Sequence, residues 1–132
     1  RRVLFRSASY RGKVEDKGMV LSRSKFSYCY ENNRDITNYI TEKIFDAMMA
    51  GCVPIYWGAN NVGDYIPKEC FIDFRKFSSY DALYHFLNKI SPKSFKSYQA
   101  AGRNFINSQD FIVHSSQSFA SRLINRVLVD FH

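Results

Sequence analysis

Four polar side chains that lie close together in the sequence could bind an anionic sugar compound. They are Asn32, Tyr39, Glu42 and Lys43. The carboxylate of Glu42 can accept hydrogen bonds from sugar hydroxyls, and the ammonium of Lys43 can neutralise a diphosphate and stabilise it as a leaving group. Tyr39 adds a ring face and a hydroxyl. The set suits a sugar nucleotide, but its spacing alone fits the ordinary solvated first turn of a helix equally well.

Glu42 and Lys43 occupy the predicted start of a short helix. Thr41 is a good N-cap residue, because its hydroxyl can accept a hydrogen bond from a free backbone amide of the first turn. The residues from Glu42 to Ala50 are mostly good helix formers, and Gly51 follows where a left-handed residue commonly ends a helix. The start of such a helix presents unpaired N–H groups and a partial positive charge, which favour an anionic ligand.

A strand is predicted immediately before this segment. From Phe26 to Tyr30, aromatic residues alternate with small ones, and Glu31 and Asn32 follow directly. Ligands of parallel α/β domains lie at the carboxyl ends of the strands. Glu31 and Asn32 therefore fall where a ligand would be met.

Two further strands are predicted after the helix. The segment from Val53 to Trp57 is almost continuously apolar, as expected for a strand covered by helices on both faces. Pro54 lacks an N–H group, which predicts that it is the first residue of its strand or lies in an edge strand. The run from Cys70 to Phe74 is the next strand. This order of elements predicts a three-layer α/β domain whose three strands are parallel neighbours.

The other apolar patterns predict helices that pack onto the sheet and carry no chemistry. A short helix is expected from Met19 to Ser24. A second runs from Ser79 to Ile90, and a third from Pro92 to Phe105 behind Ser91 as N-cap residue. A fourth is expected from Ser116 to Phe131.

Composition limits the classes of partner. The chain has 132 residues, of which 45% are hydrophobic, so it is the size of one domain and can bury a core. Its formal net charge of +7 favours an anionic partner such as a nucleotide, nucleic acid or acidic membrane surface. Because the Lys and Arg residues are scattered and no nucleic-acid-binding motif is present, we expect no nucleic acid partner. Peripheral membrane contact stays open, and the sequence gives no oligomeric state.

Missing motifs exclude several enzyme classes. The sequence contains no dinucleotide-binding G-x-G-x-x-G, no phosphate-binding P-loop, no G-x-S-x-G nucleophile elbow and no zinc-binding H-E-x-x-H. The cysteines and histidines are Cys29, Cys52, Cys70, His85, His114 and His132. The cysteines lack metal-ligand spacing and are expected to be small buried thiols, and the histidines are expected to be surface residues. No metal site is predicted.

Two sequence motifs occur together and resemble a known family. They are Y-x-T-E-K, from Tyr39 to Lys43, and G-x-V-P-I-x-x-G, from Gly51 to Gly58. With Asn32 before them, they resemble the donor-binding domain of the α1,3/α1,4-fucosyltransferases, glycosyltransferase family 10. The resemblance is strong from Lys25 to Phe77.

The resemblance implies a fold and an activity. It implies that the chain is the Rossmann-like, carboxyl-terminal half of a two-domain GT-B enzyme, and that this half binds GDP-fucose. The donor-binding residues would be Asn32, Tyr39, Glu42 and Lys43, with no metal and no other cofactor. The implied reaction is an inverting transfer of fucose to a hydroxyl of a glycan acceptor that contains N-acetylglucosamine or glucose.

The resemblance assigns no catalytic base to this chain. The family's base is expected in the amino-terminal acceptor domain, so the catalytic residue is unknown and the isolated chain should be inactive. The family also uses an arginine upstream of the first strand. Arg11 is too close to Lys25 to be that residue.

The first seven residues, Arg-Arg-Val-Leu-Phe-Arg-Ser, resemble translated adapter sequence. We therefore treat residues 1–7 as a non-native tail and residues 8–132 as the donor-binding domain. An ordinary basic strand is the alternative interpretation.

Two other functions remain open at this stage. The chain could belong to a GT-B transferase that uses another nucleotide sugar, which competition between GDP and UDP would reveal. It could also be a non-catalytic basic interaction module of the same fold. A bacterial source is favoured, with a cytoplasmic or peripheral membrane location. A eukaryotic enzyme of this kind would lie in the Golgi membrane.

Overall fold

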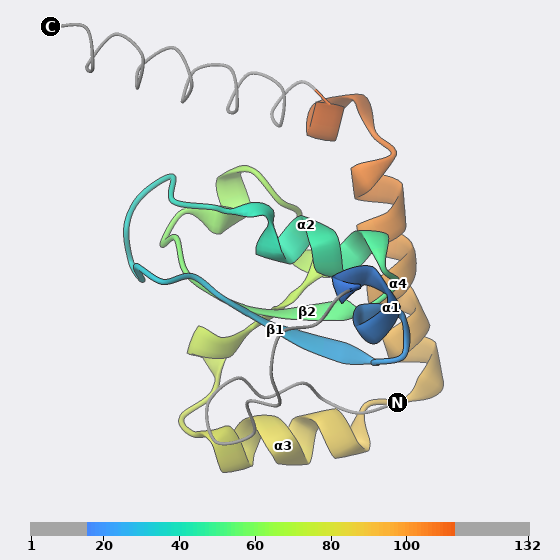
Figure 1. Ribbon diagram of the computed structural model, residues 1–132. Helices are drawn as coiled ribbons and strands as arrows, with labels where there is room; N and C mark the ends of the chain where they lie inside the picture. The colour runs from blue at the N-terminus through green and yellow to red at the C-terminus, as the bar shows by residue number, and fades with distance from the viewer. Residues whose placement is uncertain (1–15, 113–132) are drawn as a thin grey trace, which may run out of the picture.

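The computed structural model describes residues 16–112, which form a three-layer α/β domain (Figure 1). The elements are α1 (Lys17–Ser22), β1 (Phe26–Tyr30), α2 (Glu42–Met49), β2 (Val53–Trp57), β3 (Ile72–Asp73), α3 (Tyr80–Lys89) and α4 (Pro92–Ile106). Short 3₁₀ turns occur at Val62–Asp64, Lys68–Cys70 and Phe74–Lys76. The strands are parallel in the order β1-β2-β3, with α2 on one face of the sheet and α3 on the other. The predicted fold class is confirmed.

Alternation along the strands produces the two faces of the core. Cys29 and Tyr56 point to the α2 side, where they pack with Ile44 and Ala47. Their strand neighbours, such as Ile55, point to the other side and pack against α3. Helix α4 serves both sides, because its first half joins the α3 cluster and its end joins the α2 cluster. The apolar character of β2 therefore reflects burial on both faces.

The position of Pro54 corrects the sequence prediction. Pro54 is the second residue of the central strand, so the expectation of a first residue or an edge strand is wrong. Successive residues of a strand direct their backbone groups to opposite neighbours, and the N–H of Val53 donates to Lys25 O on the β1 side. The missing N–H of Pro54 thus faces the β3 side. There the pairing begins only at Ile55, so no ladder hydrogen bond is lost.

The third strand is shorter than predicted. Only Ile72 and Asp73 pair with β2, and Cys70 belongs to a 3₁₀ turn. The carboxylate of Asp73 accepts a hydrogen bond from the backbone N–H of Arg75 at 3.0 Å. This local bond turns the chain out of the sheet, because aspartate side chains compete with the ladder for backbone amides.

Serine side chains cap two of the helices. Ser91 accepts a hydrogen bond from the first turn of α4, as predicted, and Ser79, predicted as the first residue of its helix, is instead the N-cap residue of α3. Helix α1 begins at Lys17, two residues before the predicted Met19, because the Asp16 carboxylate accepts from the Met19 N–H. Gly51, with φ of 79°, adopts the left-handed conformation after α2. The predicted helix 116–131 and the tail 1–7 lie outside the described residues.

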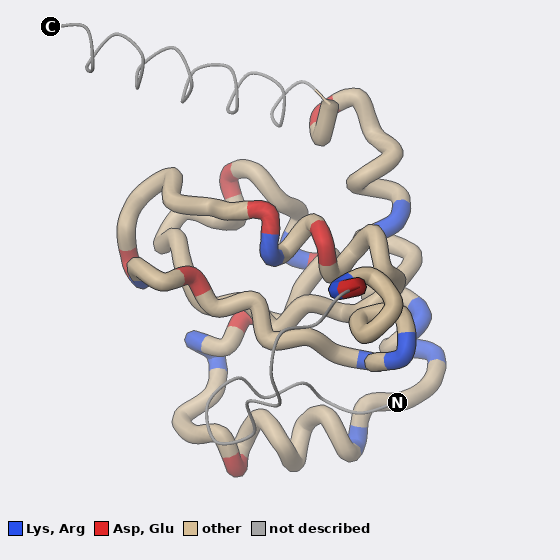
Figure 2. Tube along the Cα trace, viewed as in Figure 1, with Lys and Arg blue, Asp and Glu red and all other residues tan. Residues whose placement is uncertain are grey.

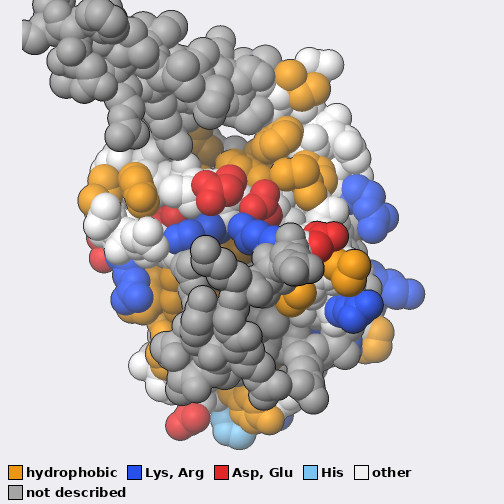
Figure 3. Space-filling view, in the orientation of Figure 1, with side chains coloured by type: hydrophobic (Ala, Val, Ile, Leu, Met, Phe, Trp, Pro, Cys, Tyr) orange, Lys and Arg blue, Asp and Glu red, His pale blue; other side chains and the backbone are white. Residues whose placement is uncertain are grey.

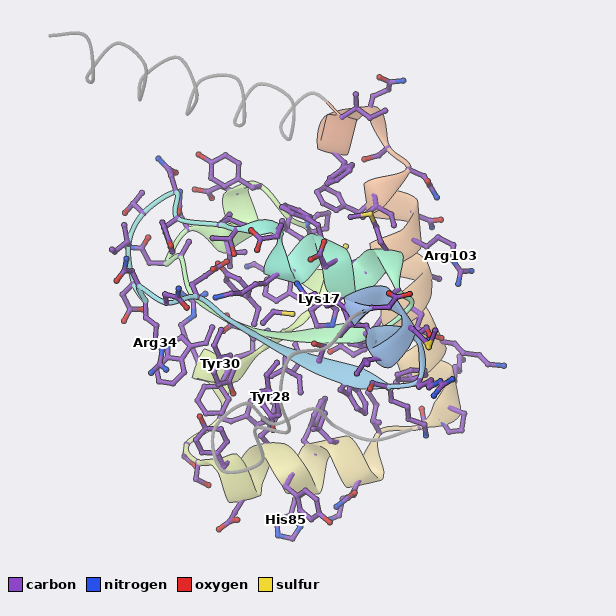
Figure 4. The ribbon with its side chains drawn as sticks, in the orientation of Figure 1. Lys17, Tyr28, Tyr30, Arg34, His85 and Arg103 are labelled. Carbon is purple, nitrogen blue, oxygen red and sulfur yellow. The ribbon has the colours of Figure 1, made fainter. Side chains whose placement is uncertain are left out.

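The described cysteines and histidine are placed as expected. All three thiols are buried and none forms a disulfide bond, and His85 lies on α3 and points away from the domain (Figure 4). His114 and His132 lie outside the described residues. Within residues 16–112 there is no group of three or more potential metal ligands, and no helix there is long and apolar enough to cross a membrane.

Replacing Gly58 by alanine should destabilise the domain. A Cβ atom there would lie 2.4 Å from Glu31 Cγ and 2.4 Å from the Tyr56 hydroxyl, both buried. We expect the free energy of unfolding in urea to fall by about 1–3 kcal/mol, the usual effect of overpacking. Gly63→Ala is the matched control, since its Cβ would meet only Lys68 Cε at 3.5 Å. An equal effect of both substitutions would contradict this prediction.

The thiol of Cys29 should be unreactive in the folded protein. Burial raises the pKa of Cys29 to about 12, above its ordinary value of 9.0, so very little thiolate exists at pH 8. Ellman's reagent should therefore modify Cys29 slowly in native protein and rapidly in urea. The native rate should rise as the pH approaches the raised pKa. Rapid native labelling of Cys29 at pH 8, mapped by mass spectrometry, would refute the buried placement.

Candidate functional site

The loop between β1 and α2 lies at the carboxyl end of the sheet and contains or adjoins all four predicted site residues (Figure 1). It begins at Glu31, whose backbone N–H donates to Trp57 O at 2.9 Å. It is also tied to the end of β2 by Asp35, whose N–H donates to Gly58 O at 3.0 Å. The carboxyl ends of β1 and β2 are therefore one continuous edge, as expected of a ligand-binding edge in a parallel sheet.

Glu31 is a buried structural residue rather than an exposed ligand contact. Its side chain is 0% exposed. One carboxylate oxygen accepts from the Thr41 N–H at 2.8 Å, and the other accepts from the Thr41 hydroxyl at 2.7 Å. The sequence prediction that Glu31 would meet a ligand is therefore wrong for its carboxylate, which is used to hold the start of α2.

Thr41 is the N-cap residue of α2, but it does not act as predicted. Its hydroxyl makes no capping bond to the helix and instead donates to Glu31. The physical reason is that a hydrogen bond to a buried carboxylate is strong, and it orients the Thr41 hydroxyl toward Glu31 rather than toward the helix N–H groups. The Thr41 side chain therefore does not accept from the N–H groups of the first turn of α2. The start of the helix is available to an anion.

Lys43 lies in the first turn of α2, and its ammonium reaches back to the end of β1. It donates to Tyr30 O at 2.9 Å and to Asn32 Oδ1 at 3.1 Å, and it lies 3.8 Å from Glu31 Oε2. An ammonium has three donors, so these two hydrogen bonds leave one donor for another acceptor. The structure thus brings together two of the predicted residues, Asn32 and Lys43.

Glu42 and Tyr39 are placed differently. Glu42 is exposed on the first turn of α2, and Figure 2 shows this acidic position followed directly by a basic one. Tyr39 is half-buried, and its backbone carbonyl lies 3.5 Å from the Tyr56 hydroxyl. Neither side chain has a hydrogen bond to the residues that the structure describes in detail.

Tyr56 is a buried residue of β2 whose hydroxyl contacts both the loop before α2 and the loop after β2. Its hydroxyl accepts a hydrogen bond from the Ala59 N–H at 3.1 Å. Burial, with the nearby charge of Glu31, raises the pKa of Tyr56 above its ordinary value. The phenol therefore stays neutral at physiological pH and provides a hydrogen-bonding group in a fixed position.

Arg34 is a candidate that sequence reasoning missed. Its guanidinium carbon lies 4.0 Å from the centre of the Trp57 ring and 5.9 Å from that of Tyr30, and Figure 4 shows Arg34 beside Tyr30. Such stacking orients the cation while leaving its donors free. The sequence could have indicated this contact, because Tyr30 and Trp57 are the last residues of two neighbouring strands and Arg34 follows Tyr30 by four residues.

The predicted site residues are accessible at the surface, since Asn32 and Glu42 are exposed and Tyr39 and Lys43 are half-buried. Two hollows elsewhere in the described residues, of about 340 and 430 Å³, are lined by other side chains. Figure 3 shows basic and acidic side chains side by side over the face that carries α1 and α2. One such pair, Lys17 and Asp46, is joined at 2.7 Å. The surface is therefore of mixed charge, and specific contacts rather than a broad positive field must select a ligand.

Comparisons with known proteins agree on one family. The model described as "Glycosyltransferase family 10 (fucosyltransferase) C-term" matches residues 6–120. The chain is 38% identical over 82 residues to an alpha-(1,4)-fucosyltransferase from Arabidopsis thaliana, covering 61% of this chain and 20% of that protein. It is 41% identical over 69 residues to the alpha-(1,3)-fucosyltransferase FucT of Helicobacter pylori, covering 52% of this chain and 14% of that protein. The chain thus spans about a fifth or less of these relatives.

Solved structures give the same result. A crystal structure of an alpha1,3-fucosyltransferase with GDP-fucose matches with a TM-score of 0.61 and 27% identity, over 69% of this chain and 27% of that one. A structure of an alpha1,3-fucosyltransferase with GDP matches with a TM-score of 0.59 and 28% identity, over 65% and 26%.

Replacing Glu31 by glutamine should destabilise the domain. Both carboxylate oxygens accept hydrogen bonds from Thr41, and glutamine offers only one acceptor while leaving Lys43 without its counter-charge. We expect a loss of about 2–4 kcal/mol in the free energy of unfolding, measured in urea. Glu69→Gln, at an exposed position, is the control and should change it by less than about 0.5 kcal/mol. A Glu31→Gln variant of wild-type stability would show that the bonds from Glu31 to Thr41 do not stabilise the start of α2.

Proposed function

The chain belongs to glycosyltransferase family 10, the fucosyltransferases, and we propose that it forms the part of an α1,3-fucosyltransferase that binds GDP-fucose. The observation that carries this proposal is the Lys43 ammonium. It is held at the carboxyl end of β1 by Tyr30 O and Asn32, and one donor remains free beside the open start of α2. A diphosphate fits there, because it meets both a cation and unpaired helix N–H groups.

The other predicted residues take complementary roles in this proposal. Glu42 accepts hydrogen bonds from sugar hydroxyls next to the diphosphate, and Tyr39 covers the donor with its ring and hydroxyl. Lys43 neutralises charge that develops on GDP as the bond to fucose breaks. The similarity to fucosyltransferases solved with GDP-fucose and with GDP supports this donor over another nucleotide sugar.

The remainder of the reaction lies outside this chain. In the proposal an acceptor hydroxyl, on a glycan containing N-acetylglucosamine or glucose, attacks the anomeric carbon of fucose, and GDP leaves with inversion. A separate acceptor domain supplies the general base. Because Lys43 and the helix start meet the diphosphate charge, we propose that donor binding needs no metal ion. The relatives include plant, bacterial and animal proteins and so do not select a source. A bacterial source, with a cytoplasmic or peripheral membrane location, stays a prediction.

Calorimetry on the purified chain tests the donor. GDP and GDP-fucose should bind more tightly than UDP, binding should weaken as salt rises, and EDTA should not change it. Lys43→Gln should weaken GDP binding by on the order of tenfold or more, since a charge-assisted contact is lost. Lys17→Gln makes the same change in net charge on the neighbouring surface and should have little effect. Equal binding of GDP and UDP would remove the fucosyltransferase-specific part of the proposal.

Turnover in a full-length enzyme containing this domain tests the roles of Glu42 and Lys43. Removing either charge, by Glu42→Gln or Lys43→Gln, should lower kcat/KM by on the order of a hundredfold. Because Lys43 also lies 3.8 Å from the buried Glu31 carboxylate, each variant must first be shown to be folded by urea unfolding. Wild-type kinetics in both folded variants would leave the donor-site assignment without support.

A further inference from the structure

Two asparagines from different loops form a reciprocal pair beside the candidate site. Asn38 belongs to the loop before α2, and Asn61 to the loop after β2. The Asn38 backbone N–H donates to Asn61 Oδ1 at 2.9 Å, and Asn61 Nδ2 donates to Asn38 Oδ1 at 2.7 Å. The Tyr65 hydroxyl donates to the same Asn38 oxygen at 2.7 Å. We call Asn38, Asn61 and Tyr65 the asparagine lock.

The orientation of both amides follows from one donor that cannot be reversed. A backbone N–H only donates, so the Asn61 atom facing it must be the amide oxygen. The amide nitrogen of Asn61 then faces the Asn38 side chain, which must present its oxygen. Asn38 therefore acts only as an acceptor in these side-chain contacts, while Asn61 must both accept and donate.

The asparagine lock joins the loop before α2, which contains a residue with positive φ, to a loop after β2 that is anchored by buried residues. Asn38 has φ of 65°, in the left-handed region that asparagine tolerates better than most residues. Asn61 and Tyr65 flank a short 3₁₀ turn whose Val62 is 2% exposed, and Ile66, which follows Tyr65, is 1% exposed. A second contact, from Thr37 Oγ1 to Asn60 Oδ1 at 3.1 Å, runs between the same two loops.

The residue that follows Asn38 is Tyr39, which is predicted to contact the nucleotide sugar. The Ile40 N–H donates to Asn38 O at 3.1 Å and the Tyr39 N–H donates to Ile36 O at 3.2 Å, so the backbone on both sides of Tyr39 is fixed by the turn that Asn38 makes. Releasing Asn38 would let this turn relax. The direction of the Tyr39 side chain would then no longer be set.

We propose that the asparagine lock is a positioning device, in which Asn38 and Asn61 hold Tyr39 in the conformation that binds the nucleotide sugar. This inference rests on the proposed function, because it names residues that act on the same site without touching the ligand. Its physical effect is to keep the loop in one conformation before the ligand arrives. Binding is weakened by the fraction of time that a loop spends in other conformations.

The different roles of the two asparagines allow a charge-matched test. Asn38→Asp keeps an oxygen that accepts from Asn61 and Tyr65, and aspartate also tolerates positive φ. Asn61→Asp keeps the acceptor for the Asn38 N–H but places a second oxygen against Asn38 Oδ1 where a donor is needed. Both variants add one negative charge in the same place. Any general electrostatic effect on an anionic ligand is therefore the same in both.

Calorimetry with GDP-fucose on the purified chain gives the main result. We expect Asn38→Asp to bind within about threefold of wild type and Asn61→Asp to bind about tenfold more weakly, the effect expected if the loop is competent about a tenth of the time. Urea unfolding of each variant shows that binding is measured on folded protein. Equal affinities of the two variants, weak or strong, would overturn the proposal.

A second measurement distinguishes positioning of Tyr39 from a general structural effect. In a Tyr39→Ala background, Asn61→Asp should weaken binding by less than about twofold, because there is no side chain left to position. If the tenfold loss persists there, the lock does not act through Tyr39 and the proposal is wrong. If wild-type protein binds no GDP-fucose, the proposed function fails with it. If wild type binds and Asn61→Asp binds equally well, only the positioning role fails.

Discussion

One buried carboxylate, that of Glu31, connects the segments that form the carboxyl edge of the sheet. A buried charge is tolerated only when its hydrogen bonds are satisfied, and here Thr41 supplies both a backbone and a hydroxyl donor. Lys43 provides the counter-charge, and Gly58 leaves the room that the Glu31 side chain occupies. These four residues are separated in the sequence but form one physical unit. They hold the start of α2 against the carboxyl ends of β1 and β2.

This unit explains which parts of the fold could be predicted from the sequence. The strands, the helices α2, α3 and α4, and the parallel order follow from local patterns, because apolar periodicity, Ser caps and Gly51 act within a few residues. Pro54 was misjudged because its acceptability depends on where β3 begins to pair, which is a property of another strand. The capping role of Thr41 was misjudged for the same reason, since Glu31, the acceptor that orients the Thr41 hydroxyl, is ten residues away.

The candidate site was predicted in part. The polar residue types near one helix start pointed to an anionic ligand, and the structure does bring Asn32 to the Lys43 ammonium. Sequence spacing could not show that Glu31 turns inward, because its burial depends on the room left at Gly58. Arg34 and Asn61 were missed because their partners, Trp57 and Asn38, lie on different loops or strands. Contacts between distant loops are the part of a site that local pattern cannot reveal.

The contacts within the domain also show for which of the four predicted residues folding alone would explain the residue type. Lys43 and Asn32 have partners within the domain, so a fold without any ligand would still favour an ammonium and an amide at these positions. Glu42 is exposed and has no hydrogen bond within the described residues, and helix propensity alone would accept many residues there. A requirement for a carboxylate at Glu42 would therefore be direct evidence of a ligand. A requirement for Lys43 combines two effects, charge balance with Glu31 and contact with a diphosphate, and only binding measured on folded protein separates them.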